Sequence, residues 1–461
     1  MAESILGRVA AKARPDGTIL AVFERKVPAT VHTVPRKMSG PSYEKQLLPS
    51  ADVFEDALKH DLSAWFPRCI DRIWGGFLCD LNYNWKPSGP QLKLLEFQAR
   101  TTRLSAQVAA RPGFESYRAF AAHGFRYLRE VLWDDQYGGW FHLLNRQGRA
   151  LEGGTKYVHG ISYALGACVS YYELTSDPEA LDMAKRAFSW LEAVAHDHTH
   201  GGYFSALQRD GTRITSSAQS FTTAAIRDYM GTPFGLKDTN TNGDMLEALV
   251  HLGRVCPDVA IKERLKEMFH LVRDRIMVAP GIAHMYFQPD WTPVPDVAQY
   301  AETLRKANIL AASAVALGLG GDPKTAQVVK SVVDHLLQFA WDASKGGFYF
   351  AGSTFGPTYV GEARIFIKKK FWWAQAEGLE ALLTMALLYP NDEMDYLHRF
   401  TTLWSYICKN MIDWRRGGWY QVGRDTFELR RRPKATMWKD ASHETHAMLE
   451  CSRLLKTVSD A

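Results

Sequence analysis

One short pattern recurs along the chain, and its clearest copy is Asp342-Ala-Ser-Lys-Gly346-Gly347-Phe348-Tyr349-Phe350. Adjacent glycines allow a positive φ and a close approach of two backbone segments. The aspartate side chain can accept hydrogen bonds from N–H groups of the turn, and the aromatic residues favour a short strand after it. Each copy therefore predicts a tight hairpin. The other clear copies start at Asp71, Asp134, Asp197 and Asp413.

The spacing of these copies predicts six similar units. Asp71, Asp134 and Asp197 follow one another at 63 residues, and Asp342 precedes Asp413 by 71 residues. A degenerate copy that starts at Val278 fills the remaining gap, without the aspartate and with one glycine fewer. Each interval has room for two helices and a hairpin. We therefore expect a single all-α domain, a closed barrel of about twelve helices with six short hairpins.

Two dipeptides predict helix starts within these units. Asp177-Pro178 and Asp322-Pro323 each combine an aspartate N-cap with a proline in the first turn, 20 residues before a motif aspartate. Residues 1–48 fit none of the units and contain scattered basic residues and prolines. We expect them to form an N-terminal arm that is partly extended or disordered, before a barrel domain over residues 49–461.

Composition excludes several classes of function. A net charge of +5 without a long basic run in the body of the chain gives little support for nucleic-acid binding. No run of about 18 apolar residues predicts a membrane span, and the N-terminus lacks a secretory apolar region. None of the six cysteines forms a Cys-x-x-Cys pair, which favours a reducing, cytoplasmic location. The oligomeric state stays open, a homodimer included.

The stretch His196-Asp197-His198-Thr199-His200 has the alternation of a metal site. However, Asp197 belongs to the repeated turn, and the histidines fill variable positions of that turn. Metal ligands have to converge in space, which the alternation alone does not establish. We therefore favour a structural turn here and expect no metal.

Three groups of charged residues are candidates for chemistry. Asp244 and Glu247 lie three residues apart and share a helix face, either as a functional pair or as simple complements of a helix dipole. Glu302 and Arg305 have the same spacing, either as functional residues or as a simple ion pair. His443 lies at the start of the last helix among charged neighbours, which favours a functional role over a place in the core.

At these residues the chain resembles the N-acylglucosamine 2-epimerase family of sugar epimerases and isomerases, over about residues 50 to 457. The most specific stretch is Trp372-Trp373-Ala-Gln375-Ala-Glu377. The other matching stretches are Gln98-Ala-Arg100, Asn240 through Glu247-Ala248, and Trp438-Lys439 with His443. The resemblance implies an (α/α)6 barrel with short hairpins at one rim, a sugar substrate and no cofactor.

The resemblance also implies roles for single residues. Substrate-binding roles fall to Arg100, Trp372, Glu377 and Asn240, and catalytic or orienting roles fall to His443, Asp244, Glu302 and Glu247. The chain departs from the family where Asp244 and Glu302 stand in place of histidines, and where His446 stands in place of an arginine. The sugar pocket is thus implied, but the family's pair of histidines is not.

Family chemistry begins with removal of a proton beside the sugar carbonyl, which gives an enediolate. Histidine suits this step because its pKa lies near working pH. Aldose–ketose isomerisation needs one base, whereas epimerisation at C2 needs a second group on the opposite face, either Asp244 or Glu302. Two alternatives stay open: a glycoside hydrolase or lyase that uses Asp244 or Glu247 with Glu302 as an acid/base pair, and a sugar-binding relative without activity.

Overall fold

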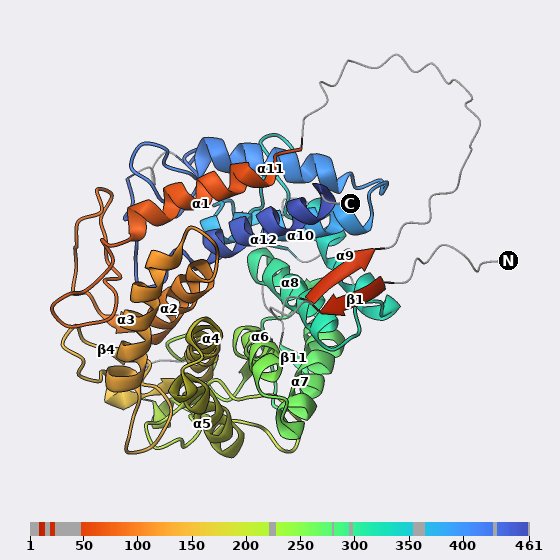
Figure 1. Ribbon diagram of the computed structural model, residues 1–461. Coiled ribbons are helices and arrows are strands. Elements are labelled where there is room, and N and C mark those ends of the chain that lie inside the picture. Colours follow the sequence, from red (N-terminus) through yellow and green to blue (C-terminus); the bar gives the residue numbers. More distant parts are fainter. Residues whose placement is uncertain are drawn as a thin grey trace, which may run out of the picture.

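The computed structural model describes residues 9–13, 19–23, 48–220, 227–278, 281–294, 298–353, 365–426 and 431–459. Within the predicted N-terminal arm, β1 (Val9–Ala13) and β2 (Ile19–Phe23) pair as an antiparallel hairpin. Strand β2 contacts helix α8 of the barrel (Figure 1). Residues 1–8, 14–18 and 24–47 of the arm lie outside the described residues.

The twelve α-helices of the described residues form two concentric layers (Figure 1). The inner layer contains α2 (Leu95–Ala109), α4 (Val158–Thr175), α6 (Thr239–Val255), α8 (Tyr300–Ala316), α10 (Trp372–Leu388) and α12 (Ser442–Ser459). The outer layer contains α1 (Ala51–Trp65), α3 (Arg118–Tyr127), α5 (Pro178–Val194), α7 (Val259–Leu271), α9 (Pro323–Phe339) and α11 (Tyr396–Asn410). Single π-helical turns, η2 (Leu128–Leu132) and η5 (Val272–Ile276), continue α3 and α7.

Contacts between helices close the inner layer into a ring. Each inner helix packs against the next, and α12 packs against α2. Every inner helix also packs against one outer helix, with α1 covering α12 and α11 covering α10. The predicted all-α barrel is thus confirmed. No helix in the described part of the chain is long and apolar enough to cross a membrane.

The helix starts follow the predicted capping chemistry. The Asp322 side chain accepts a hydrogen bond from the Thr325 backbone N–H at 3.0 Å, with Pro323 in the first turn of α9. Helix α9 then buries one apolar stripe, Val329, Val332, Val333 and Leu336, against the inner layer. Burial of such stripes between the two layers forms the core of the ring.

The remaining elements are short. The 3₁₀ turns are η1 (Glu115–Tyr117), η3 (Glu152–Gly154) and η4 (Ser217–Gln219). The two-residue strands form the antiparallel pairs β3 (Lys93–Leu94) with β4 (Leu143–Leu144), β5 (Lys156–Tyr157) with β6 (Ala206–Leu207), and β8 (Met277–Val278) with β9 (Ile282–Ala283). One three-stranded sheet contains β7 (Lys237–Asp238), β10 (Tyr286–Phe287) and β11 (Pro293–Val294). A second contains β12 (Ala298–Gln299), β13 (Ala351–Gly352) and β14 (Ile365–Ile367).

The repeated motif forms the predicted hairpin. In the copy at Asp342, its N–H donates to the Gly347 carbonyl at 2.9 Å, and the Gly346 N–H donates to the Asp342 carbonyl at 2.8 Å. Gly346 and Gly347 have φ of 77° and 87°, and a Cβ on Gly347 would lie 2.7 Å from Gln375 Oε1. Both conditions require glycine. In the degenerate copy, Met277–Val278 pairs with Ile282–Ala283, so this hairpin persists, with Ala279 and Pro280 outside the described residues.

A buried lysine locks each complete motif. Its Nζ lies 2.7–3.0 Å from the motif aspartate and donates to the carbonyl of the first motif glycine. The five pairs are Lys93–Asp71, Lys156–Asp134, Lys237–Asp197, Lys370–Asp342 and Lys434–Asp413. In the degenerate unit Val278 replaces the aspartate, and Ala298 stands two residues before its inner helix, where Lys237 stands before α6. This unit has therefore lost both charges together.

Candidate active site

Polar side chains from all six inner helices meet inside the ring. A continuous series of contacts of 2.9–3.3 Å runs from α12 to α2 through His443, Glu377, Arg305, Asp244, His159 and Glu96, in that order. A further pair crosses the ring from α2 to α6, because Arg103 Nη2 lies 2.6 Å from Glu247 Oε1. Each inner helix contributes one member of the series, so closure of the ring assembles it.

His443 and Glu377 form a dyad at the start of the series. His443 Nδ1 lies 2.9 Å from Glu377 Oε1. Since a carboxylate only accepts hydrogen bonds, Nδ1 carries a proton, and Nε2 has no hydrogen-bond partner among the described residues. Asn308 Nδ2 donates to the other oxygen, Glu377 Oε2, at 3.0 Å. Burial raises the pKa of Glu377, but the hydrogen bond from His443 and the charge of Arg305 outweigh it, so this pKa is lowered.

Arg305 is the centre of the series because it binds three carboxylates from two neighbouring helices. Its Nη2 lies 2.7 Å from Glu247 Oε2, its Nη1 3.3 Å from Glu377 Oε1, and its Nε 3.3 Å from Asp244 Oδ1. Burial raises the pKa of Glu247, but the charges of Arg103 and Arg305 outweigh burial and lower it. Glu247 is therefore held as a carboxylate. The alternative of a simple ion pair between Glu302 and Arg305 is wrong, because the neighbouring helices offer Arg305 closer partners.

Asp244 is surrounded by three cationic groups. Lys306 Nζ lies 2.6 Å from its Oδ1, where Arg305 also binds, and His159 Nε2 lies 3.1 Å from its Oδ2. Burial raises the pKa of Asp244, but the charges of Arg305 and Lys306 and the bond from His159 bring it well below its usual value. Such a carboxylate is a weak base, so this geometry disfavours Asp244 for proton abstraction.

His159 joins Asp244 to Glu96. Its Nδ1 lies 3.1 Å from Glu96 Oε1, and its Nε2 faces Asp244. Burial lowers the pKa of His159, but bonds to the two carboxylates raise it to about 9. Both ring nitrogens are occupied, so His159 is a bound cation between two helices.

Replacing His159 with glutamine should destabilise the protein in a pH-dependent way. The pKa of about 9 in the folded state lies above the value of about 6.5 for a free histidine, so the bound proton stabilises the fold. This contribution, roughly 3 kcal/mol, is complete below pH 6.5 and is lost as the pH rises through 9. Urea unfolding of wild type and His159→Gln between pH 5.5 and 9.5 measures it. A difference that is constant over this range would contradict the assignment.

Glu302 lies in a different environment from Asp244. Its nearest cation is Lys306, with Nζ 3.7 Å from Oε2. Burial, aided by the charge of Asp244, raises the pKa of Glu302, and Lys306 and Arg305 offset only part of this. A carboxylate with a raised pKa is a stronger base than one with a lowered pKa. Of the two carboxylates, Glu302 is thus better suited than Asp244 to acid–base chemistry.

Gly243 makes room for Lys306. A Cβ at Gly243 would lie 2.4 Å from Lys306 Cδ and 2.6 Å from Cε, and the Lys306 side chain is fully buried. Gly243→Ala should therefore lower the free energy of unfolding by about 1–3 kcal/mol, the usual cost of overpacking. The matched control is Gly253→Ala on the same helix, where a Cβ meets only ordinary contacts at 3.7 Å. This control should stabilise by about 0.5–1 kcal/mol, and equal effects of the two variants would contradict the fit.

Arg100 lies on α2, one turn after Glu96, and faces α12. Its Nε lies 2.8 Å from Asp440 Oδ2, and its guanidinium lies over the Tyr163 ring at 5.2 Å from the centroid. Arg100 and Asp440 are both buried. Asp440 Oδ1 accepts a hydrogen bond from the Ser442 N–H at 2.7 Å, which fixes it at the start of α12, three residues before His443.

The two paired tryptophans have different positions. Trp372 is buried, with Lys439 Nζ 4.9 Å from its ring centroid. Trp373 is half-buried, and its ring centroid lies 5.7 Å from that of His443. Trp373 is therefore better placed than Trp372 to meet a ligand at His443. Asn240 lies at the start of α6, and its buried Oδ1 has no hydrogen-bond partner among the described residues.

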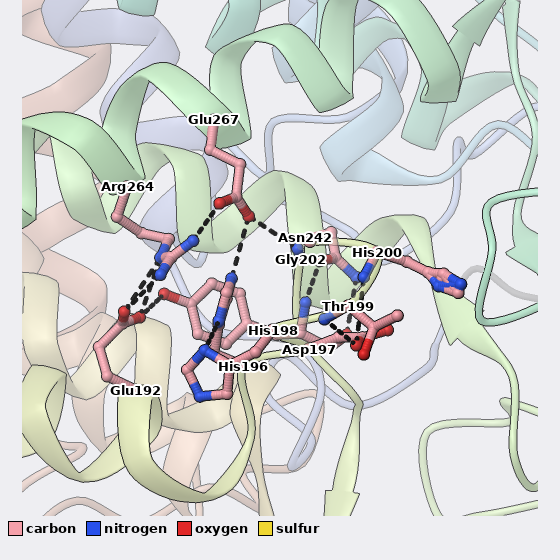
Figure 2. Close-up of polar contacts among 12 residues, drawn as sticks. Glu192, His196, Asp197, His198, Thr199, His200, Gly202, Asn242, Arg264 and Glu267 are labelled. Atoms are coloured by element: carbon pink, nitrogen blue, oxygen red, sulfur yellow. Dashed lines mark hydrogen bonds and ion pairs between the residues drawn. The ribbon is translucent and has the colours of Figure 1, made fainter.

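The histidine-rich turn is structural (Figure 2). The Asp197 carboxylate accepts from the backbone N–H of Thr199 and His200 and binds Lys237. His196 Nε2 lies 3.0 Å from Glu267 Oε1, and the Nδ1 atoms of His196 and His198 lie 3.1 Å apart. Within the described residues, no group of three or more His, Cys, Asp or Glu side chains is arranged to hold a metal ion. The contacts of this turn are thus those of a packed repeat element.

Comparisons with known proteins agree with this fold. A model of the N-acylglucosamine 2-epimerase (GlcNAc 2-epimerase) family matches residues 225–448. Over 394 residues the chain is 25% identical to a cellobiose 2-epimerase from Bacteroides fragilis, which covers 84% of this chain and 95% of that protein.

Solved structures show the same architecture. A cellobiose 2-epimerase from Spirochaeta thermophila superposes with a TM-score of 0.76 at 24% identity, over 89% of this chain and 97% of that one. A D-mannose isomerase superposes with a TM-score of 0.75 at 21% identity, over 90% of this chain and 100% of that one. The family model thus matches just under half of this chain, and the solved structures share its fold.

Proposed function

We propose that this protein is a carbohydrate isomerase or 2-epimerase that acts on a free sugar, with His443 as the general base. The observation that carries this proposal is the dyad of His443 and Glu377, in which Nδ1 faces the carboxylate at 2.9 Å and no described residue forms a hydrogen bond with Nε2. A base oriented in this way can remove the proton beside a sugar carbonyl and produce an enediolate. Arg100, with unfilled N–H groups, is suited to hold a sugar oxygen.

The second proton-transfer group of an epimerase is assigned to Glu302. Glu302 lies one turn before Lys306 on α8, with Oε2 3.7 Å from Lys306 Nζ, and burial raises its pKa; we assign to it delivery of a proton to the face of the enediolate opposite His443. Asp244 instead supports the site by binding Arg305, Lys306 and His159. Glu377 and Glu247 then act as positioning residues, and Trp373 contributes an apolar face beside His443.

A glycoside hydrolase is less well supported. Glycoside cleavage by two carboxyl groups needs one of them protonated as the acid. Burial raises the pKa values of Asp244 and Glu247, but neighbouring cations outweigh burial and lower them, so neither is suited to that role. Glu302 has the raised pKa of an acid. Its partners Asp244 and Glu247 both bind Arg305, however, which leaves neither free to attack a sugar or to activate water.

A cytoplasmic location is part of the proposal. All six cysteines are unpaired, and four of them are buried. Free thiols of this kind persist in a reducing compartment. Reaction of the unfolded protein with a thiol reagent after isolation under non-reducing conditions would count six free groups, and a lower count would contradict this location.

Proton NMR in D2O, with aldoses, ketoses and β-1,4-linked disaccharides as substrates, tests the activity. Loss of the C2–H signal together with a new epimer or ketose is the expected result. Glu302→Gln should reduce epimer formation about 10²-fold and leave ketose formation in place. Asp244→Asn should lower both products to a similar extent, because it loosens Arg305 and His159.

Other outcomes distinguish the rival functions. Selective loss of epimer formation in Asp244→Asn would move the second role to Asp244. Cleavage of a glycoside without exchange at C2 would favour the hydrolase. Binding of sugars without exchange or cleavage would identify a sugar-binding relative that lacks activity.

A further inference from the structure

The six inner helices carry no free cationic side chain in the part of the chain that the structure describes. Every arginine and lysine on them has a carboxylate within 2.5–2.8 Å. The seven pairs are Arg100–Asp440, Arg103–Glu247, Arg254–Glu173, Arg305–Glu247, Lys306–Asp244, Arg453–Glu450 and Lys456–Glu55. The wall of the ring therefore offers no unmatched positive charge to a ligand.

Carboxylates match the cations on the same helices. The nine acidic residues are Glu96, Glu173, Asp244, Glu247, Glu302, Glu377, Glu380, Glu444 and Glu450, against seven arginines and lysines and two of the histidines, His159 and His446. Burial lowers the pKa of both histidines, but neighbouring carboxylates raise it to about 9, so both carry a positive charge. The described inner helices thus offer no excess of positive charge to an anionic sugar.

Arg100 has its charge matched but its hydrogen-bonding capacity unfilled. Its Nε lies 2.8 Å from Asp440 Oδ2 and forms an ion pair with it, but the angle does not suit a hydrogen bond. Neither Nε nor Nη2 has a hydrogen-bond partner among the described residues. Arg100 and Asp440 are 7% and 1% exposed, so water cannot readily fill these positions. An unfilled buried donor costs free energy that a ligand can recover. A neutral hydroxyl or carbonyl oxygen satisfies Arg100 without adding charge beside Asp440.

We propose that Asp440 is a specificity-determining residue that restricts this site to neutral sugars and excludes sugars that carry a carboxylate, phosphate or sulfonate. This inference rests on the proposed function, since it assumes that the site inside the ring binds a sugar. Asp440 cancels the charge of Arg100 and leaves its N–H groups available. An anionic sugar at Arg100 meets the repulsion of Asp440 without a free cation to offset it.

Binding of a matched pair of sugars tests the proposal directly. D-Mannose and D-mannuronate share the same ring and differ by a carboxylate at C6, and other neutral aldoses that exchange in D2O can be paired with their uronates in the same way. Titration calorimetry of wild type should show affinity at least about tenfold higher for the neutral member. Asp440→Asn should reduce the ratio of the neutral-sugar affinity to the uronate affinity by about tenfold, because it leaves the Arg100 charge unmatched.

Two further variants control for folding and for overall charge. Asp440→Ser keeps an oxygen that can accept the Ser442 N–H and should narrow the ratio as Asp440→Asn does. Glu173→Gln removes the same charge beside Arg254, at the far end of α4, and should leave the ratio unchanged. Equal binding of the two sugars by wild type, or an unchanged ratio in both Asp440 variants, would overturn this inference but not the proposed function. Failure to bind any neutral sugar would overturn both.

Discussion

Replacing His443 with asparagine is expected to reduce solvent-deuterium exchange at the sugar C2 by about 10²- to 10⁴-fold. The asparagine side chain can still donate an N–H to Glu377, so the local packing is largely kept. It offers no nitrogen lone pair in place of Nε2, however, and proton abstraction loses its base. Because Arg100 is untouched, sugar affinity measured by calorimetry should stay within a few-fold of wild type.

The matched control is His446→Asn, one helical turn further along α12. His446 Nε2 pairs with Glu380 Oε2 at 3.3 Å and belongs to neither the dyad nor the series that leads to Glu96. Exchange in this variant should stay close to wild type. Exchange at the wild-type rate in His443→Asn would instead show that His443 is structural and that another group removes the proton.

Lys237→Met is expected to lower the free energy of unfolding by about 3–5 kcal/mol, the usual cost of removing one partner from a buried ion pair. Lys237 is fully buried, and its Nζ binds Asp197 Oδ2 at 2.7 Å and the carbonyls of Gly201 and Pro289. Methionine fills a similar volume but leaves Asp197 without its counterion. Guanidinium unfolding followed by tryptophan fluorescence measures the change.

A second substitution should recover part of this loss. Asp197→Asn combined with Lys237→Met leaves no buried charge, and asparagine can still accept the N–H groups of the turn. The double variant should therefore be more stable than Lys237→Met alone, as the natural unit with Val278 and Ala298 suggests. Lys324→Met, which breaks an exposed pair with Asp274, should change stability by less than about 1 kcal/mol. Strictly additive effects at positions 197 and 237 would show that the two charges are not coupled.

The fold was predictable because its determinant is local and repeated. Each aspartate, glycine pair and aromatic lies within nine residues, and the hairpin they form depends on short-range hydrogen bonds and backbone conformations. The degenerate copy at Val278 was also recognisable, since it lies 64 residues before Asp342, close to the interval of 63 between the first copies. Helix starts at Asp177 and Asp322 followed from capping chemistry in the same local way.

The lysine that locks each motif was harder to see. It follows its aspartate by 22 residues in the first two units, a regularity that the sequence contains. In later units the separation is 40, 28 and 21 residues, because the loop before the inner helix varies in length. Its position two residues before the inner helix is constant in four units, but only the structure defines that start.

The sequence predicted which residues lie in the candidate site better than it predicted which of them contact one another. His443, Asp244, Glu247 and Glu377 were singled out by local pattern and resemblance, and the structure brings all four to Arg305 or its partners. Arg305 was matched with Glu302 by spacing, whereas its partners lie 58 to 72 residues away on other helices. Sequence reasoning missed three site residues, His159, Lys306 and Asp440. The role of each depends on an ion pair with a residue that is distant in sequence.

The series from His443 to Glu96 limits how the number of units can change. Open solenoids gain or lose repeats at their ends, and their stability changes roughly in proportion. Here each inner helix supplies one member of the series, so deletion of a unit would separate two contacting side chains, and insertion of one would push them apart. Variation is thus expected as loops of different length and as single replacements such as Val278 with Ala298, while a count of six is preserved by the chemistry in the middle of the ring.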